Sequence, residues 1–180
     1  THVTHIYKAD DIHLAILLTY VSPLAINFNG GYLRGWINSC VLGDSGTGKS
    51  ATYMRISDWL ELGDLFSSLS GTRTGLLYSI AKKAGGDWHV QIGRYVMASG
   101  KIIAIDEVQE TPADEIKKMA KAMDEGWLEV SQVASGGYRT QTRTIFLMNP
   151  KFGKKISDFP YGCQAIVDCF DPMFIRRLDI

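Results

Sequence analysis

Cysteine is scarce in this sequence, and no segment is long and apolar enough to resemble a membrane span. The three cysteines, Cys40, Cys163 and Cys169, form an odd set without a CxxC pair. This usage argues against a disulfide framework and favours a reduced, intracellular setting. The longest apolar stretch, residues 14–26, is interrupted by polar residues and a proline, and it is shorter than the ~20 residues that cross a bilayer. Acidic residues precede it, which is atypical of a signal peptide.

An excess of charge of either sign is also lacking, because 19 basic side chains balance 19 acidic ones. A protein that coats nucleic acid statically is normally basic, so the balance argues against that class but leaves transient or ring-based binding open. The charges are unevenly placed, with eight acidic residues in 106–129 and none in 131–157. The second stretch contains Arg139, Arg143, Lys151, Lys154 and Lys155. Either these stretches are ordinary solvated faces, or a basic binding surface follows an acidic site.

The length of 180 residues predicts one domain with a core of its own. Apolar runs at 36–42, 101–105 and 144–148 predict buried strands. A helix is predicted for residues 11–20, before the first of these strands, and another for residues 49–60, between the first and the second. Strands that alternate with helices predict an α/β fold with a largely parallel sheet.

A further helix is expected after residue 111, with Thr111 as its N-cap and Pro112 at its first position. Its buried face is expected to consist of Ile116, Met119, Ala120 and Met123. Residues 87–97 and 127–142 resemble β-hairpins inserted into the α/β pattern, and Gly136-Gly137 is the predicted turn of the second.

A phosphate-binding loop is the strongest signal in the chain. Residues 43–50 match the pattern GxxxxGK[ST] in full, after a predicted strand and at the start of a predicted helix. They are Gly43, Asp44, Ser45, Gly46, Thr47, Gly48, Lys49 and Ser50. In such a loop, backbone N–H groups face the phosphates, Lys49 would reach the β- and γ-phosphates, and Ser50 would bind Mg²⁺. The alternative is a flexible Gly/Ser turn.

Hydrolysis needs acidic groups beside that loop, and two follow the buried run 102–105. Asp106 is the candidate to bind the metal, and Glu107 the candidate to orient and polarise the attacking water. Both stand at the carboxyl end of a parallel strand, where the loop also lies. An ordinary acidic turn at a strand end is the alternative.

Two further candidates are a polar amide and a basic pair. Asn149 follows the third strand, where it would contact the γ-phosphate or the water, although Asn-Pro turns are common. Arg176 and Arg177 stand near the end of the chain, either as a solvated pair or as an arginine finger offered to a neighbouring subunit.

Six segments resemble, in order, motifs of the minichromosome maintenance (MCM) helicases, which are AAA+ ATPases. They are similar to the segment before Walker A, a GLT-type stretch, the approach to Walker B, the end of the next helix, sensor 1 and the arginine-finger box. These segments are residues 33–38, 74–80, 88–100, 123–126, 148–150 and 175–179. The resemblance covers 33–180, and the order of the motifs makes it more specific than Walker motifs alone.

The resemblance implies a single AAA+ core over residues 1–180, with the P-loop NTPase three-layer fold, a central parallel sheet and two β-hairpin inserts. Residues 1–32 would form a helical lead-in, 86–98 a helix-2-type insert, and 127–142 a presensor-1-type hairpin facing DNA in a central channel. No lid domain is expected, so we expect the chain to be a fragment of a longer protein.

The resemblance also implies ATP and Mg²⁺ as cofactors, a hexameric ring, and single-stranded or forked DNA as the partner. Its catalytic set would be Lys49, Asp106, Glu107, Asn149 and Arg177, with Arg176 as the rival finger. Two departures stand out. Where the family's hairpin carries a lysine, this sequence has Ser131 or Gln132, with Tyr138 and Arg139 further along, and Gly48 replaces a frequent alanine.

The sequence therefore predicts an ATP-hydrolysing motor domain of an MCM-like DNA helicase in replication. The alternative is a protein remodeller or chelatase-like ATPase of the same AAA+ branch, whose hairpins would grip protein. A non-hydrolysing scaffold is a third class, against which the intact Lys49, Asp106 and Glu107 argue.

Overall fold

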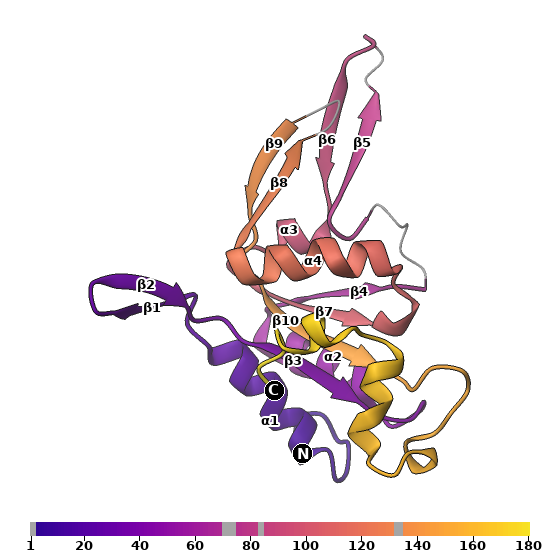
Figure 1. Cartoon of the computed structure of the whole chain (residues 1–180). Helices are drawn as coiled ribbons and strands as arrows, with labels where there is room; N and C mark the ends of the chain where they lie inside the picture. The colour runs from indigo at the N-terminus through magenta and orange to yellow at the C-terminus, as the bar shows by residue number, and fades with distance from the viewer. Residues whose placement is uncertain (1–2, 70–74, 83–84, 132–134) are drawn as a thin grey trace.

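A four-stranded parallel sheet forms the centre of the molecule in a computed structural model that describes residues 3–69, 75–82, 85–131 and 135–180. Its strands are β3 (Asn38–Leu42), β10 (Arg143–Met148), β7 (Ile102–Asp106) and β4 (Asp64–Ser67), in that spatial order (Figure 1). In the register, Met148 pairs with Leu42 and Leu147 with Asp106. The carboxyl ends of three strands therefore meet at one edge of the sheet.

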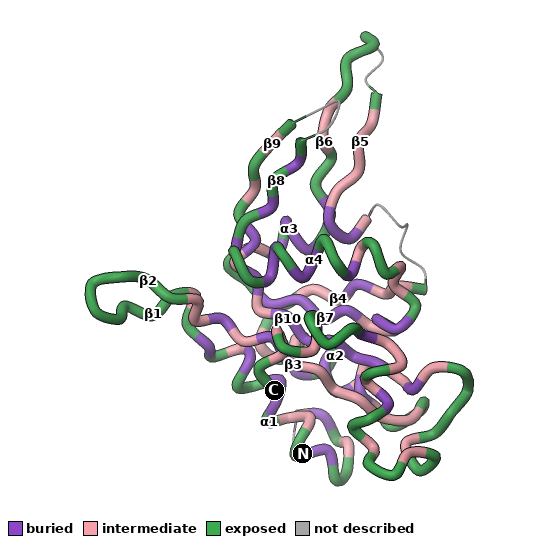
Figure 2. The backbone as a smooth tube through the Cα atoms, viewed as in Figure 1, coloured by how far each residue is buried: buried purple, intermediate pink, exposed green. Residues whose placement is uncertain are grey.

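Both faces of the sheet are buried, as expected of parallel strands that read as continuous apolar runs. Along β7, Ile102 and Ala104 point to a core shared with α1 (Asp10–Val21) and α2 (Lys49–Leu60). Ile103 and Ile105 point to the larger core under α4 (Ala113–Glu125). Figure 2 shows the buried backbone concentrated in these central layers. The chain thus has the α/β fold of a P-loop NTPase.

The C-terminal part of the chain covers the α4 side of the sheet. Phe146 of β10 packs edge-on against Phe174, with ring centroids 5.4 Å apart, and Phe170 lies against both rings. Phe174 belongs to α5 (Pro172–Ile175), which begins at the N-cap Asp171. The 3₁₀ segments Ile156–Asp158 and Gly162–Asp168 precede it, and Val108–Glu110 forms a third such turn after β7.

Three hairpins extend from this body (Figure 1). The first pairs β1 (Ala25–Phe28) with β2 (Gly31–Arg34), the second β5 (Tyr78–Lys82) with β6 (Trp88–Ile92), and the third β8 (Trp127–Ser131) with β9 (Ser135–Arg139). The second and third stand together beyond α4, and the short α3 (Arg94–Met97) follows β6. No described helix is long and apolar enough to cross a membrane.

Two expectations about the hairpins are wrong. The strands of the second hairpin pair residues 78–82 with 88–92, and the expected stretch 93–97 is mainly the short helix α3. In the third hairpin, Gly136 and Gly137 lie inside β9 rather than at the turn, since Ser131 pairs with Ser135. The glycines make room for aromatic rings, because a Cβ on Gly137 would lie 2.4 Å from the Trp127 ring.

Other boundaries differ in instructive ways. The helix α4 begins at Ala113 with Pro112 rather than Thr111 as its N-cap, and proline has no side-chain group that could cap it. The Thr111 hydroxyl instead bonds the Ser68 hydroxyl at 2.8 Å. The predicted face Ile116, Met119, Ala120 and Met123 is buried as expected. The sequence did not reveal β4 or the β1–β2 hairpin, so the lead-in of residues 1–32 is not simply helical.

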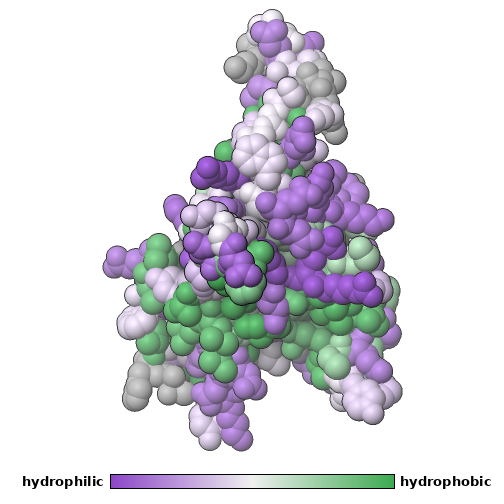
Figure 3. Space-filling model, turned by 60° about the vertical axis from the view of Figure 1, so that its left-hand side comes forward, coloured by the Kyte–Doolittle hydropathy of each residue, from purple (hydrophilic) through white to green (hydrophobic). Residues whose placement is uncertain are grey.

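Apolar side chains form a band across the side of the molecule on which α1 and the β1–β2 hairpin lie, below a largely hydrophilic upper part (Figure 3). The exposed apolar side chains of these elements are Leu14, Leu17, Leu18, Val21, Ile26, Phe28, Tyr32 and Leu33. α1 is apolar on its outer as well as its inner side, which is unusual for a helix that faces water.

Candidate nucleotide site

The loop between β3 and α2 curls because two glycines adopt left-handed backbone conformations. Gly46 and Gly48 have φ values of 78° and 83°, which a side chain would disfavour. The Thr47 hydroxyl donates to the Asp44 carbonyl at 2.9 Å, and the Asp44 carboxylate accepts the Ile156 N–H at 2.8 Å. The loop therefore ends at the N-terminus of α2, where unpaired N–H groups favour an anion.

Lys49 lies in this loop with only 6% of its surface exposed. Its ammonium donates to the carbonyls of Gly43 at 2.8 Å and Asp44 at 2.9 Å, and to the Asn149 Oδ1 at 2.7 Å. Burial lowers the pKa of the Lys49 ammonium, while nearby carboxylates, Glu107 first, oppose that shift. The oxygens around it hold the charge at the centre of the loop.

Glu107 occupies a strained position just past β7. Its φ of 53° is left-handed, an uncommon conformation for a residue with a side chain and one that clusters at functional sites. Its N–H donates to the Asp106 Oδ1 at 3.0 Å. Its carboxylate accepts from the Asn149 amide at 2.9 and 3.1 Å. The turn thereby aims Glu107 back over the sheet edge.

Asn149 joins the two charged groups. Its amide oxygen accepts from Lys49 and its amide nitrogen donates to Glu107, so a single side chain bridges the ammonium and the carboxylate. Gly43 N–H donates to the carbonyl of Met148 at 3.2 Å, which fastens the loop to the end of β10. The strand register thus brings together the residues predicted from three separate motifs.

Gln109 is part of the same network, and the sequence did not single it out. It is 8% exposed and lies in the 3₁₀ turn Val108–Glu110. Its Nε2 donates to the Glu107 carboxylate, and its Oε1 accepts the Asn149 N–H at 3.2 Å. The one available signal was a polar residue three positions after the acidic strand end Asp106, which no motif marks as functional.

A pocket of about 240 Å³ opens over these groups. Its lining consists of Ser45, Gly46, Thr47, Gly48, Lys49, Ser50, Ala51, Asp106, Glu107 and Asn149. The Ser50 hydroxyl and the Asp106 carboxylate share the pocket, and hard oxygen donors of this kind suit Mg²⁺. The pocket therefore brings together backbone N–H groups at a helix N-terminus, the Lys49 ammonium and oxygen donors of the kind that suit a divalent cation.

A second pocket, of about 480 Å³, shares Gly43, Thr47 and Lys49 with the loop. The rest of its lining is mostly apolar and comes from the start of α1 and from β3: Lys8, Ala9, Asp11, Ile12, Ala15, Cys40, Val41, Leu42 and also Ile180. Ile6 lies nearby, because a Cβ on Gly48 would be 3.5 Å from its side chain. Two adjoining pockets, one polar and one apolar, thus meet at the loop.

A family model described as the MCM P-loop domain matches residues 1–160. The chain belongs to this family. It is 27% identical over 152 residues to the minichromosome maintenance protein MCM of Saccharolobus solfataricus, covering 81% of this chain and 22% of that protein. It is 26% identical over 148 residues to the probable DNA helicase MCM9 of Oryza sativa subsp. indica, with the same coverage. It is 27% identical over 153 residues to the DNA replication licensing factor mcm5 of Dictyostelium discoideum, covering 81% and 20%. The chain spans about a fifth of the length of these relatives.

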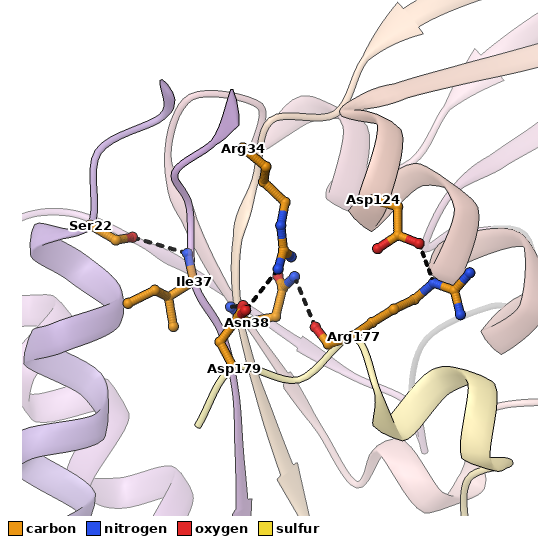
Figure 4. Close-up of polar contacts among 7 residues, drawn as sticks. All are labelled: Ser22, Arg34, Ile37, Asn38, Asp124, Arg177 and Asp179. Carbon is orange, nitrogen blue, oxygen red and sulfur yellow. Dashed lines mark hydrogen bonds and ion pairs between the residues drawn. The ribbon is translucent and has the colours of Figure 1, made fainter. Parts of the chain in front are cut away.

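The basic pair of this MCM P-loop domain lies away from the pocket. Arg177 donates through Nε to the Asp124 Oδ2 at 2.5 Å (Figure 4). It also donates through Nη1 to the Met173 carbonyl. Arg176 is exposed. Within the described ranges, no hydrogen bond or ion pair links either arginine to Lys49 or Glu107.

The basic stretch 131–157 does not form one surface in the MCM P-loop domain. Arg143 donates to the carbonyls of Ser22 at 2.7 Å and Gly100 at 3.1 Å, and Lys154 pairs with Asp168 at 2.8 Å. Arg139 is exposed at the end of β9. Ser131 ends β8, Tyr138 is half-buried in β9, and Gln132 lies outside the described residues.

Proposed function

We propose that this MCM P-loop domain binds ATP with Mg²⁺ and hydrolyses it as the motor part of a replicative DNA helicase. The observation that carries the proposal is the continuous bond path from Lys49 through Asn149 to Glu107, at the mouth of the phosphate loop. The Asn149 amide thereby links the Lys49 ammonium, which can bind phosphate, to the Glu107 carboxylate, which can polarise water. Such an arrangement serves phosphoryl transfer to water better than nucleotide storage.

Each side chain has a distinct task in this proposal. Lys49 neutralises the β- and γ-phosphates, and N–H groups of the loop fix their position. Mg²⁺, held by Ser50 and Asp106, supplies further charge neutralisation at the phosphate oxygens. Glu107 accepts the proton of the attacking water, and Asn149 keeps that carboxylate in register with the γ-phosphate.

The apolar pocket beside the loop is the proposed site of the nucleotide base. It adjoins the phosphate pocket through Thr47 and Lys49, which line both, so that a nucleotide can lie across the two pockets. Ala9 and Ile12 on one side and Leu42 on the other offer flat apolar contact of the kind that a purine ring takes.

Arg177 and the hairpins are the proposed links to partners. Arg177 would act as the finger at the site of a neighbouring copy in a hexameric ring. In agreement with this role, Arg177 bonds Asp124 and is not among the described residues that line the phosphate pocket of its own subunit. The exposed apolar side chains of α1 and β1–β2 support packing between copies. The β8–β9 hairpin, with Arg139 exposed, would contact single-stranded or forked DNA in the channel.

The test is DNA-stimulated ATP turnover and strand displacement by the full-length protein, at a series of salt concentrations. We expect stimulation by DNA that weakens as salt rises, because backbone contacts release counterions. Lys49→Ala should abolish turnover in every condition. If neither single- nor double-stranded DNA changes the rate of ATP turnover at low salt, the DNA motor is refuted and the protein remodeller is favoured. Wild-type turnover by Lys49→Ala would refute the nucleotide site.

A further inference from the structure

The segment that follows Arg177 is fastened to the beginning of β3, the strand that leads to the phosphate loop. The Asp179 carboxylate accepts the Asn38 N–H through Oδ2 at 2.9 Å and the Arg34 guanidinium through Oδ1 at 2.7 Å (Figure 4). In return, the Asp179 N–H donates to the Asn38 carbonyl at 2.8 Å. The Asn38 side chain, fully buried, donates to the Arg177 carbonyl at 3.5 Å.

These contacts are joined to the phosphate loop by a single strand, β3. Asn38 is the first residue of β3, and Gly43 follows directly after the last. β3 is paired along its length with β10, so a displacement of its first residue cannot be absorbed by bending of a free strand. We define the clamp as Arg34, Asn38 and Asp179. The clamp therefore holds the first residue of β3, and the phosphate loop follows the last residue of this paired strand.

The side chain of Arg177 is held from a second direction. Its ion pair with Asp124 comes from the last turn of α4, whereas the clamp holds its main chain from β3 (Figure 4). The Arg177 side chain keeps 22% of its surface exposed, so its remaining guanidinium N–H groups are open to a second acceptor. A guanidinium held this way is oriented before any neighbour arrives.

We propose that the clamp positions Arg177 for the nucleotide of a neighbouring subunit and ties that position to the phosphate loop of its own subunit. The proposal rests on the proposed function, since it takes Arg177 as the finger. Asp179 is thus a positioning residue, because it acts through the Arg177 main chain and touches no nucleotide. A finger contributes about 10³–10⁵ in kcat, and a displacement of about 1 Å costs on the order of 100-fold.

The test uses Asp179→Ala in the full-length protein. We expect kcat to fall about 100-fold, with a much smaller change in ATP affinity, because Lys49 and the other residues of the phosphate loop are unchanged. Asp168→Ala is the matched control, since it removes an aspartate of another ion pair in the same part of the chain and should leave kcat unchanged. Asp179→Asn keeps an acceptor for the Asn38 N–H while losing the charge toward Arg34, and it serves if the alanine variant does not fold.

A mixing experiment separates a positioning role from a structural one. Asp179→Ala subunits keep a sound pocket, and Lys49→Ala subunits keep a sound finger. Mixed rings should therefore regain part of the turnover that each variant lacks alone. Wild-type kcat in Asp179→Ala, or mixed rings that stay inactive, overturns the clamp.

The same experiment with Arg177→Ala distinguishes the two levels of the proposal. If Arg177→Ala complements Lys49→Ala and Asp179→Ala does not, the clamp is wrong and the finger stands. If Arg177→Ala alone keeps wild-type turnover, the finger itself is refuted, and the clamp proposal falls with it.

Discussion

Replacing Asn149 by alanine is the sharpest test of the candidate site, because one side chain bonds both charged groups. The variant removes an acceptor 2.7 Å from the Lys49 ammonium and a donor 2.9 and 3.1 Å from the Glu107 carboxylate. Hydrogen bonds to charged groups contribute about 1.5–3 kcal/mol. If one such bond is specific to the transition state, kcat falls about 10- to 150-fold.

The assay is steady-state ATP turnover beside equilibrium binding of nucleotide. We expect the loss mainly in kcat, because the phosphate loop and Lys49 are unchanged and affinity depends chiefly on them. Asn149→Asp refines the test, since it keeps the acceptor for Lys49 but sets a carboxylate against Glu107. It should be no more active than the alanine variant. Near wild-type kcat in either variant would show that the amide bridge has no part in hydrolysis.

Three further results are expected. Glu107→Gln should bind ATP and hold it unhydrolysed, since the shape survives but the base is lost; normal turnover in a single-turnover assay would move the base elsewhere. Maleimide at pH 8 should label the exposed Cys163 much faster than the half-buried Cys40, because burial raises the pKa of the Cys40 thiol to about 12 and keeps it protonated; equal labelling rates by mass spectrometry would contradict the fold at β3. Gly137→Ala should lower the free energy of unfolding in urea by about 1–3 kcal/mol, through collision with the facing indole, whereas Gly85→Ala, whose Cβ meets open space, should be neutral; matching midpoints would disprove the β8–β9 register.

The parts of the fold that local patterns dictate were predictable. The phosphate loop is one short segment, in which the glycines allow the turn and the lysine supplies the positive charge. The helix α2 that follows it begins and ends at the predicted residues. The carboxyl ends of parallel strands meet at one edge, so the sequence pattern alone places Asp106, Glu107 and Asn149 near Lys49.

What the sequence did not reveal depends on contacts between distant positions. The clamp joins Asn38 to Asp179, 141 positions apart, and no local pattern announces such a bond. Gln109 contacts Glu107 and Asn149 because it lies in the 3₁₀ turn that follows the left-handed Glu107. The periodicity of apolar residues does not indicate such a turn. The strands β1 and β2 are exposed almost throughout, so they lack the alternation by which a half-buried strand is recognised.

The helix α4 has a mechanical consequence that follows from its two ends. Its first turn follows closely on the Asp106–Glu107 edge, and its last residue is separated by Gly126 alone from the hairpin strand β8. A helix of 13 residues is about 20 Å long. A rotation of about 10° at the first turn therefore carries the base of the hairpin roughly 3 Å, at the rise of 1.5 Å per residue. α4 thus has the geometry of a lever arm, in which a small rotation at the sheet edge would produce a larger displacement at the base of the β8–β9 hairpin.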